Sequence, residues 1–181
     1  MGFARKGDSV LAEVDLRDLA GEAVQLAERE AANKDIEIVF ETVHSENRIW
    51  SDPYQLRQVL LNLLTNAIYA TAREGKISIK LESTDDEAAF TIKDTGQGIP
   101  KENLERIFEP FFSTKPPGEG TGLGLFVTRG IVEKLGGSIK VESRLGMGAS
   151  FCVKLPKCFE VKEGISEEHH TDVLDKMVKM D

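Results

Sequence analysis

The chain has 181 residues, of which 40% are hydrophobic, and carries a formal net charge of -8. This length allows one well-filled core, so we expect one main domain with tails. The acidic balance excludes nonspecific binding to nucleic acid or to an anionic membrane surface, because the long-range field repels polyanions. No stretch approaches the roughly 20 apolar residues of a membrane span, and the opening MGFARKGDS has no signal-peptide core. We expect a cytoplasmic protein, with membrane attachment only through segments absent from this chain.

The first predicted helix follows Asp15, a residue type that caps helix N-termini, and Leu and Ala recur at helical spacing as far as Ala31. A strand is expected next, at residues 36–43. The second helix begins with Asp52 as its cap and Pro53 at its first position. Both helices are amphipathic, so each is expected to cover a sheet.

Three polar residues lie together on the flank of the second helix's apolar stripe: Asn62, Asn66 and Tyr69. One asparagine at a helix edge is ordinarily solvated and without function. Two of them at i and i+4, beside the core, favour a binding site. An amide oxygen is a neutral, hard ligand that suits magnesium, a metal commonly shared with substrate phosphates.

Residues 76–83 and 87–94 are predicted to form a hairpin of two strands. The motif DTGQGIP begins at Asp94, the last residue of the second strand. One interpretation is a tight turn capped by Asp94. The other is a binding pocket, in which this carboxylate accepts a hydrogen bond at depth. Gly96 and Gly98 would then let a flat ring approach the backbone.

Residues 99–121 are expected to form a long loop with one short helix around residues 104–107. Glycines occupy alternate positions at and just after its end, namely Gly118, Gly120, Gly122 and Gly124. They precede a helix, whose free N-terminal amides and dipole favour an anion. The spacing matches neither the dinucleotide pattern GxGxxG nor the phosphate loop GxxxxGK[ST].

The third helix, GLGLFVTRGIVEKLGG, stops at its two last glycines, and strands at residues 138–143 and 149–156 complete the pattern. Cys152 is expected at a buried position of the last strand, not in a disulfide or a metal site. Helices and strands are intermixed without regular βαβ alternation. We therefore expect an α+β fold, a two-layer α/β sandwich whose mixed sheet of about five strands is covered on one face by three helices.

The order of these motifs, an Asn-bearing helix, DTGQGIP, FEPFF and GEGTGLGL, resembles the catalytic ATP-binding domain of sensor histidine kinases. That family shares the Bergerat-type fold with type II topoisomerases, MutL and Hsp90. The resemblance implies that Asn66 binds magnesium, that Asn62 lies beside it and that Asp94 reads the adenine amino group. FEPFF would be the hinge of a lid over ATP. The other nucleotide-binding positions that it implies are Tyr69, Gly96, Gly98, Ile99, Lys115, Gly120, Thr121, Gly122, Leu123 and Gly124.

Three features depart from the common family pattern. Tyr69 stands where many relatives carry Lys, which resembles the nitrogen-regulation type, and Lys115 would meet the phosphate charge instead. Ala149 stands where many relatives have Thr or Ser beside the adenine carboxylate. No histidine lies in a phosphoacceptor sequence, since His44 is in VHSEN and the His169–His170 pair is in a polar tail. The catalytic residue therefore stays unassigned, with Asn62 and Lys115 as candidates.

The resemblance implies three parts of the chain. Residues 1–14 would be the remnant of a dimerisation helix or linker, residues 15–156 the catalytic domain, and residues 157–181 a polar tail. The implied cofactors are ATP and magnesium. The implied partners are a histidine-bearing dimerisation domain of the same protein and a downstream response regulator, with no nucleic acid.

Two other functions within the superfamily are open: an ATPase that performs conformational work, and a serine kinase that acts on a partner protein. Hydrolytic relatives place Glu four residues before the magnesium Asn to activate water. Here that position is Asn62, whose amide has no useful basicity. The sequence therefore favours a kinase over an ATPase.

Overall fold

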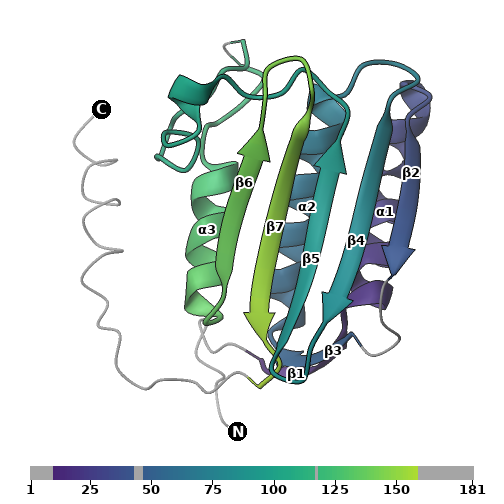
Figure 1. Cartoon of the computed structure of the whole chain (residues 1–181), viewed down its shortest axis with the longest axis vertical. Helices are drawn as coiled ribbons and strands as arrows, with labels where there is room; N and C mark the ends of the chain where they lie inside the picture. The colour runs from purple at the N-terminus through teal and green to yellow at the C-terminus, as the bar shows by residue number, and fades with distance from the viewer. Residues whose placement is uncertain (1–9, 43–46, 117, 159–181) are drawn as a thin grey trace, which may run out of the picture.

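The protein forms two layers, a twisted sheet and a set of helices, in a computed structural model that describes residues 10–42, 47–116 and 118–158. Five strands lie in the order β2-β4-β5-β7-β6 (Figure 1). Their bounds are β2 Glu37–Thr42, β4 Lys76–Ser83, β5 Glu87–Asp94, β6 Ser138–Ser143 and β7 Ala149–Pro156. β2 pairs with β4 in parallel and the other pairs are antiparallel, so the sheet is mixed. The expected α+β fold is confirmed.

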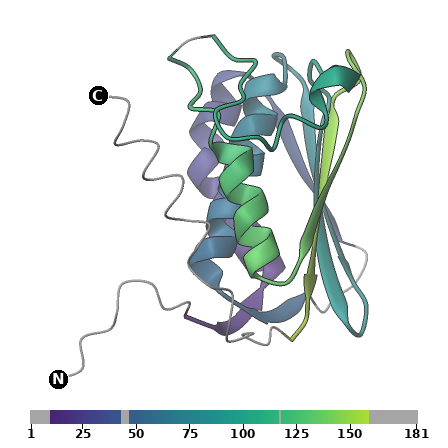
Figure 2. The ribbon, with the colours of Figure 1, turned by 90° about the vertical axis from the view of Figure 1, so that its left-hand side faces the viewer.

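Three helices cover one face of this sheet, as the side view shows (Figure 2). They are α1 Leu16–Asn33, α2 Pro53–Ala70 and α3 Gly124–Lys134. Alternate strand residues point into the core between the layers, including Ile79, Phe90 and Val153, which are at most 1% exposed. α2 meets them with a leucine-rich stripe that includes the fully buried Leu60 and Leu63. The central helix is therefore rigidly held, and its flanks can present polar residues.

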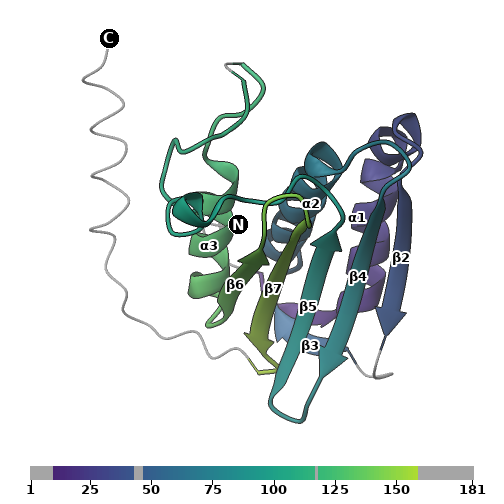
Figure 3. The same ribbon diagram turned by 45° about the horizontal axis from the view of Figure 1, so that its top comes forward.

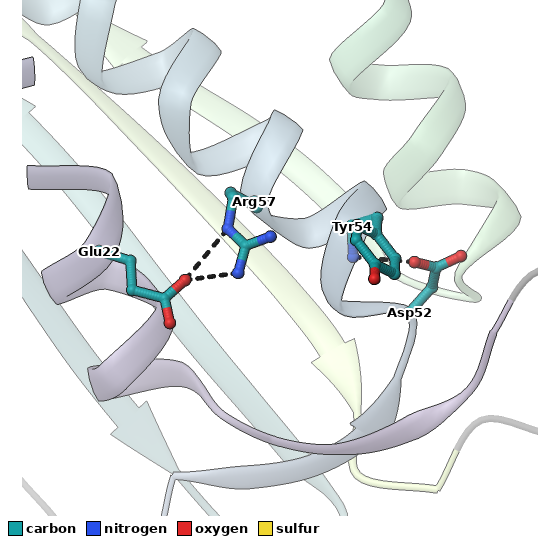
Figure 4. Close-up of polar contacts among 4 residues, drawn as sticks. All are labelled: Glu22, Asp52, Tyr54 and Arg57. Carbon is teal, nitrogen blue, oxygen red and sulfur yellow. Dashed lines mark hydrogen bonds and ion pairs between the residues drawn. The ribbon is translucent and has the colours of Figure 1, made fainter. Parts of the chain in front are cut away.

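The predicted helix caps are confirmed. Asp15 Oδ1 accepts from the amide of Arg17 at the start of α1, at 2.9 Å. At the start of α2, Asp52 Oδ1 accepts from the amide of Tyr54 at 2.9 Å (Figure 4). It also accepts from the amide of Gln55 at 3.1 Å. These contacts satisfy amides that have no partner within the helix.

α1 and α2 are also joined by an ion pair on their outer side. Arg57 Nε of α2 donates to Glu22 Oε2 of α1 at 3.1 Å (Figure 4). The pair is partly exposed, so its contribution to stability is small. Burial of the two apolar stripes, not this pair, holds the helices together.

A second, two-stranded sheet was not predicted. β1 (Ala12–Asp15) pairs antiparallel with β3 (Arg48–Ser51), and β3 continues its pairing to Cys158 through Trp50. Both strands are only four residues long, too short for a clear alternation. β1 thus begins before residue 15, where the catalytic domain was expected to start, and the bridge between Trp50 and Cys158 extends the pairing past residue 156. Residues 1–9 and 159–181, which hold the rest of the expected linker and tail, lie outside the described residues.

Two local predictions are wrong. A 3-10 helix, η1, spans Lys101–Asn103, and turns occupy the residues 104–107 that were expected to be helical. Cys152 is half-buried, because on β7 Phe151 and Val153 face the helices and Cys152 faces the opposite side. Cys152 and Cys158 are both free thiols. Among the described helices, none combines the length and the apolar character needed to cross a bilayer.

Candidate functional site

A cavity of about 570 Å³ opens between α2, the end of β5 and the loop that leads to α3. This loop lies at one end of the two layers (Figure 3). Eleven of the predicted site residues line the cavity: Asn62, Asn66, Tyr69, Asp94, Gly98, Ile99, Lys115, Gly120, Thr121, Gly122 and Gly124. Gly96 and Leu123 do not line it. The motifs that are separated in the sequence thus converge on one chamber.

Asp94 forms the deep end of the cavity and is 3% exposed. Its Oδ1 accepts from the backbone amides of Gly96 at 2.8 Å and Ala149 at 3.2 Å. Burial raises the pKa of this carboxyl above its usual value, and the two amide hydrogen bonds partly offset that rise. Oδ2 has no hydrogen-bond partner among the described residues, so one acceptor is free for a ligand in the cavity.

Tight backbone packing fixes the turn around Asp94. A Cβ on Gly96 would lie 2.3 Å from the carbonyl oxygen of Ala70, which explains why Gly96 supports the site without lining it. Gly98 has φ 69°, and a Cβ there would lie 2.1 Å from the carbonyl oxygen of Arg144. Both glycines are therefore required by the fold itself, in addition to any ligand.

Asn62 lies where α2 meets the start of α3. Its Nδ2 donates to Oγ1 of the buried Thr128 at 2.6 Å. A Cβ on Gly124 would lie 2.5 Å from Asn62 Oδ1, so this side chain fills the space that the glycine leaves. No side-chain hydrogen bond caps α3 at its N-cap Leu123, which leaves first-turn amides available to an anion.

Asn66 faces the loop across the cavity. Lys115 Nζ donates to Asn66 Oδ1 at 3.4 Å and lies 4.0 Å from the centroid of the Tyr69 ring. The Tyr69 hydroxyl donates to Glu119 Oε2 at 2.8 Å, which raises the pKa of Tyr69. Burial lowers the pKa of Lys115. The amide oxygen of Asn66 thus already accepts from a cation, so it is suited to a magnesium ion that brings its remaining oxygen ligands from phosphates and water.

The acidic and metal-binding groups of the cavity are few. Within residues 10–42, 47–116 and 118–158, no group of three or more His, Cys, Asp or Glu side chains is arranged to hold a metal ion. The acidic residues that line the cavity are Asp94 and Glu119. A metal here would therefore depend on the amide of Asn66 and on a ligand's own oxygens.

Several lining residues were missed from the sequence. The most informative are Thr65, Gln97 and Glu119. Thr65 lies one residue before Asn66 on α2, so helical spacing could have included it. Ala149 also lines the cavity, and its backbone amide donates to the Asp94 carboxylate, a role that no side-chain pattern reveals. Residues His44, His169 and His170 lie outside the described residues.

Residues 51–158 match the family described as histidine kinase-, DNA gyrase B-, and HSP90-like ATPase. The sensor histidine kinase ZraS of Salmonella typhimurium is 44% identical over 147 residues, which are 81% of this chain and 31% of ZraS.

Solved structures agree with the sequence match. The catalytic domain of histidine kinase ThkA superposes with a TM-score of 0.75 at 37% identity, covering 82% of this chain and 99% of that one. A structure of ThkA in complex with the response regulator protein TrrA matches with a TM-score of 0.71 at 35% identity, over 81% of this chain and 42% of that one.

The chain belongs to the histidine kinase-, DNA gyrase B- and HSP90-like ATPase family, and it corresponds to the ATP-binding catalytic domain of the sensor histidine kinases. It spans about a third of the length of the ZraS sequences and about a fifth of the length of the sensor kinases CckA and SrrB.

Proposed function

We propose that this domain binds ATP with magnesium and transfers the γ-phosphoryl group to a histidine on a dimerisation domain of the same protein. The observation that carries the proposal is the polarity of the cavity. A buried carboxylate with one free oxygen stands at one end, and an amide oxygen with an uncapped helix N-terminus stands at the other. An adenine base and a triphosphate match these two ends.

At the base end, Asp94 Oδ2 would accept from the exocyclic amine of adenine, while Oδ1 stays with its two backbone amides. At the phosphate end, Asn66 would hold the magnesium ion, which neutralises developing phosphate charge when bound. Lys115 is near enough to exchange its contact with Asn66 for a phosphate oxygen. The residues Gly120, Thr121, Gly122 and Gly124 would wrap the phosphates with backbone amides, because side chains are absent or small there.

The kinase function is favoured over ATP hydrolysis by Asn62. Its amide is committed to Thr128 and cannot remove a proton from water. One observation supports hydrolysis as a second candidate: Glu119 is a carboxylate at the phosphate end of the cavity. Its Oε2 already accepts from the Tyr69 hydroxyl, which opposes its use as a base.

The partners proposed for the complete protein follow from the relatives. ThkA has been crystallised with a response regulator, and we extend that class of partner to this chain. The segment before α1 would link the domain to the dimerisation domain, and the polar residues 159–181 would be a tail. We also propose a cytoplasmic location, where ATP is supplied and where free thiols such as Cys152 and Cys158 persist. The nitrogen-regulation subtype remains a proposal that rests on Tyr69.

The experiment is transfer of label from γ-labelled ATP. The chain is incubated alone, and then with a purified dimerisation domain that carries His followed by Glu. We expect acid-labile label on the added domain and none on the chain itself. Release of free phosphate without a labelled acceptor, and loss of that release in Glu119→Gln, would instead identify an ATPase. The variant Asn66→Ala is the control, since it should remove magnesium-dependent transfer.

A further inference from the structure

The C-terminal turn of α2 ends against the base end of the cavity and contains no basic residue of its own. A helix C-terminus carries partial negative charge and leaves its last four carbonyl groups without donors from the same helix. In α2 these groups belong to Ala67, Ile68, Tyr69 and Ala70. Each of the four has a hydrogen-bond donor from outside the helix, and one distant side chain donates to two of them.

That side chain is Lys34, the residue that caps the C-terminus of α1. Its Nζ donates to the carbonyl oxygens of Ile68 at 2.8 Å, Tyr69 at 3.0 Å and Thr71 at 3.1 Å. An ammonium group has three N–H donors, so all of them are used. The carbonyl oxygen of Ala67 accepts from the amide and the hydroxyl of Thr71, at 3.0 and 2.7 Å.

The remaining carbonyl, that of Ala70, connects this helix end to the turn at residues 94–98, which carries Asp94. The amide of Gln97 donates to the carbonyl oxygen of Ala70 at 3.1 Å. Gly96 packs so closely on the same oxygen that a Cβ would lie 2.3 Å from it. Asp94 accepts from the amide of Gly96, so the direction of the Ala70 carbonyl sets the turn that aims the carboxylate.

We propose that Lys34 is a positioning residue for base recognition, which fixes the last turn of α2 and thereby, through Ala70, Gly96 and Gln97, the orientation of Asp94. Lys34 does not line the cavity, so it acts without touching a ligand. The inference rests on the proposed function only in taking the ligand to be an adenine compound. It predicts that Lys34 controls affinity for the base and not for the phosphates or magnesium.

The test uses Lys34→Met, which keeps most of the apolar stem and removes the ammonium. Lys140→Met is the matched control, because it removes the same charge from an exposed position on β6. Affinities for adenosine and for ATP with magnesium are measured by calorimetry on the folded proteins. We expect Lys34→Met to weaken both ligands about tenfold, since the turn loses three charge-assisted hydrogen bonds. Lys140→Met should bind as the unchanged protein does.

Adenosine separates the two possible roles of the charge because it has no phosphate. A loss for ATP alone would overturn the proposal, since Lys34 would then act as a distant counter-charge to the phosphates. Unchanged affinity for both ligands would overturn it as well, and would leave Lys34 as a helix cap without consequence for the site.

A second measurement needs no ligand. Amide hydrogen exchange at Gln97 should be faster in Lys34→Met, while the amide of Leu60, in the middle of α2, keeps its protection. Equal protection of Gln97 in both proteins would refute the positioning role, whether or not nucleotide binds. If the unchanged chain binds no adenosine while Gln97 responds as expected, the proposed function fails and the positioning of the turn by Lys34 stands.

Discussion

At the base end of the cavity, the backbone is fixed by buried and partly buried hydrogen bonds, whereas at the phosphate end it is held by a few side chains that are partly or fully exposed. Asp94 accepts from two amides, and the amide of Ile99 donates to Ser143 Oγ at 2.8 Å. Across the cavity, the loop is tied to α2 through Lys115 and Glu119, and Glu119 is exposed. One end is therefore preformed, and the other is free to change shape.

The difference suits the two parts of an adenine nucleotide. The base is flat and rigid, and in the proposed complex a single buried acceptor would recognise it, so preorganisation would favour both affinity and specificity. The triphosphate arrives with metal and leaves in a different chemical form. A loop with little buried area can open and close around it at low cost.

The largest effect is expected from a substitution that disrupts the backbone packing at the base end. Gly148 has φ 75°, and a Cβ there would lie 1.9 Å from the carbonyl oxygen of Asp94. Gly148→Ala should lower the free energy of unfolding by about 3 kcal/mol or more, through overlap and strain together. Gly118→Ala is the matched control at the other end: its φ is 90° but nothing lies within 4 Å, so about 1 kcal/mol is expected. Urea denaturation measures both, and equal losses would contradict the comparison.

Next in size is Asp94→Asn. ATP should bind at least tenfold more weakly, because the side-chain oxygen stays with the backbone amides and the NH₂ group then faces the adenine amine, donor against donor. The fold should persist, since the amide oxygen can still accept from Gly96 and Ala149. Calorimetry of ATP binding gives the affinity, and a melting curve gives the control. Unchanged affinity would remove this carboxylate from the ligand site.

Asn66→Ala changes the other end. In the presence of magnesium, the variant should bind ATP about tenfold more weakly than the unchanged protein. In the presence of EDTA, the two proteins should bind ATP with the same affinity. Its fold should be intact, because Asn66 lies off the buried stripe of α2. Asn33→Ala, at an exposed position of α1, is the control. Magnesium dependence that survives in Asn66→Ala would refute the metal assignment.

A pH titration sharpens the description of the base end. Burial raises the pKa of Asp94, so this carboxyl takes up its proton at a higher pH than an exposed one. Adenosine affinity should therefore fall as pH is lowered, and the fall should begin at a higher pH than an ordinary aspartate would give, because protonation removes the charge that the adenine amine contacts. In Asp94→Asn the same titration should be flat. A slope that persists in the variant would assign the proton to another group.

The smallest effect concerns the loop. Tyr69→Phe removes the hydrogen bond to Glu119 and should speed amide exchange at Gly120 and Gly122 in the free protein. With ATP and magnesium bound, the variant and the unchanged protein should exchange alike, because the ligand then holds the loop. Exchange that is equally slow with and without ATP in the unchanged protein would mean that the loop is not mobile.

Most of the fold was predictable from the sequence because its elements are long and strongly periodic. α2 carries a full apolar stripe and both start signals, Asp52 and Pro53, and β4 and β5 alternate over eight residues each. The short pair β1 and β3 was missed, since four residues give too little pattern. Within the site, Asn66 and Asp94 were found by their motifs.

What escaped prediction depends on contacts between distant segments. Ala149 supports Asp94 by its backbone amide, and any residue but proline offers that group. Lys34 lies 34 residues from Ile68 and has no motif around it, so only the folded chain brings its ammonium to the end of α2. Glu119 has no motif to mark it within the predicted loop at residues 99–121, and only the folded chain shows that it contacts Tyr69.

The central claim is that Asp94 makes the cavity select adenine, and the most direct test is competition of ATP and GTP for a bound fluorescent nucleotide. Guanine presents a carbonyl oxygen where adenine has its amine, so two acceptors would face each other in a buried site. An unpaired buried polar group costs about 1 to 3 kcal/mol, and more when it is charged, so GTP should bind at least tenfold more weakly than ATP. The ratio of ATP affinity to GTP affinity should be smaller in Asp94→Asn, because the side-chain amide can donate to the guanine carbonyl oxygen. Comparable affinities for ATP and GTP in the unchanged chain would contradict the claim.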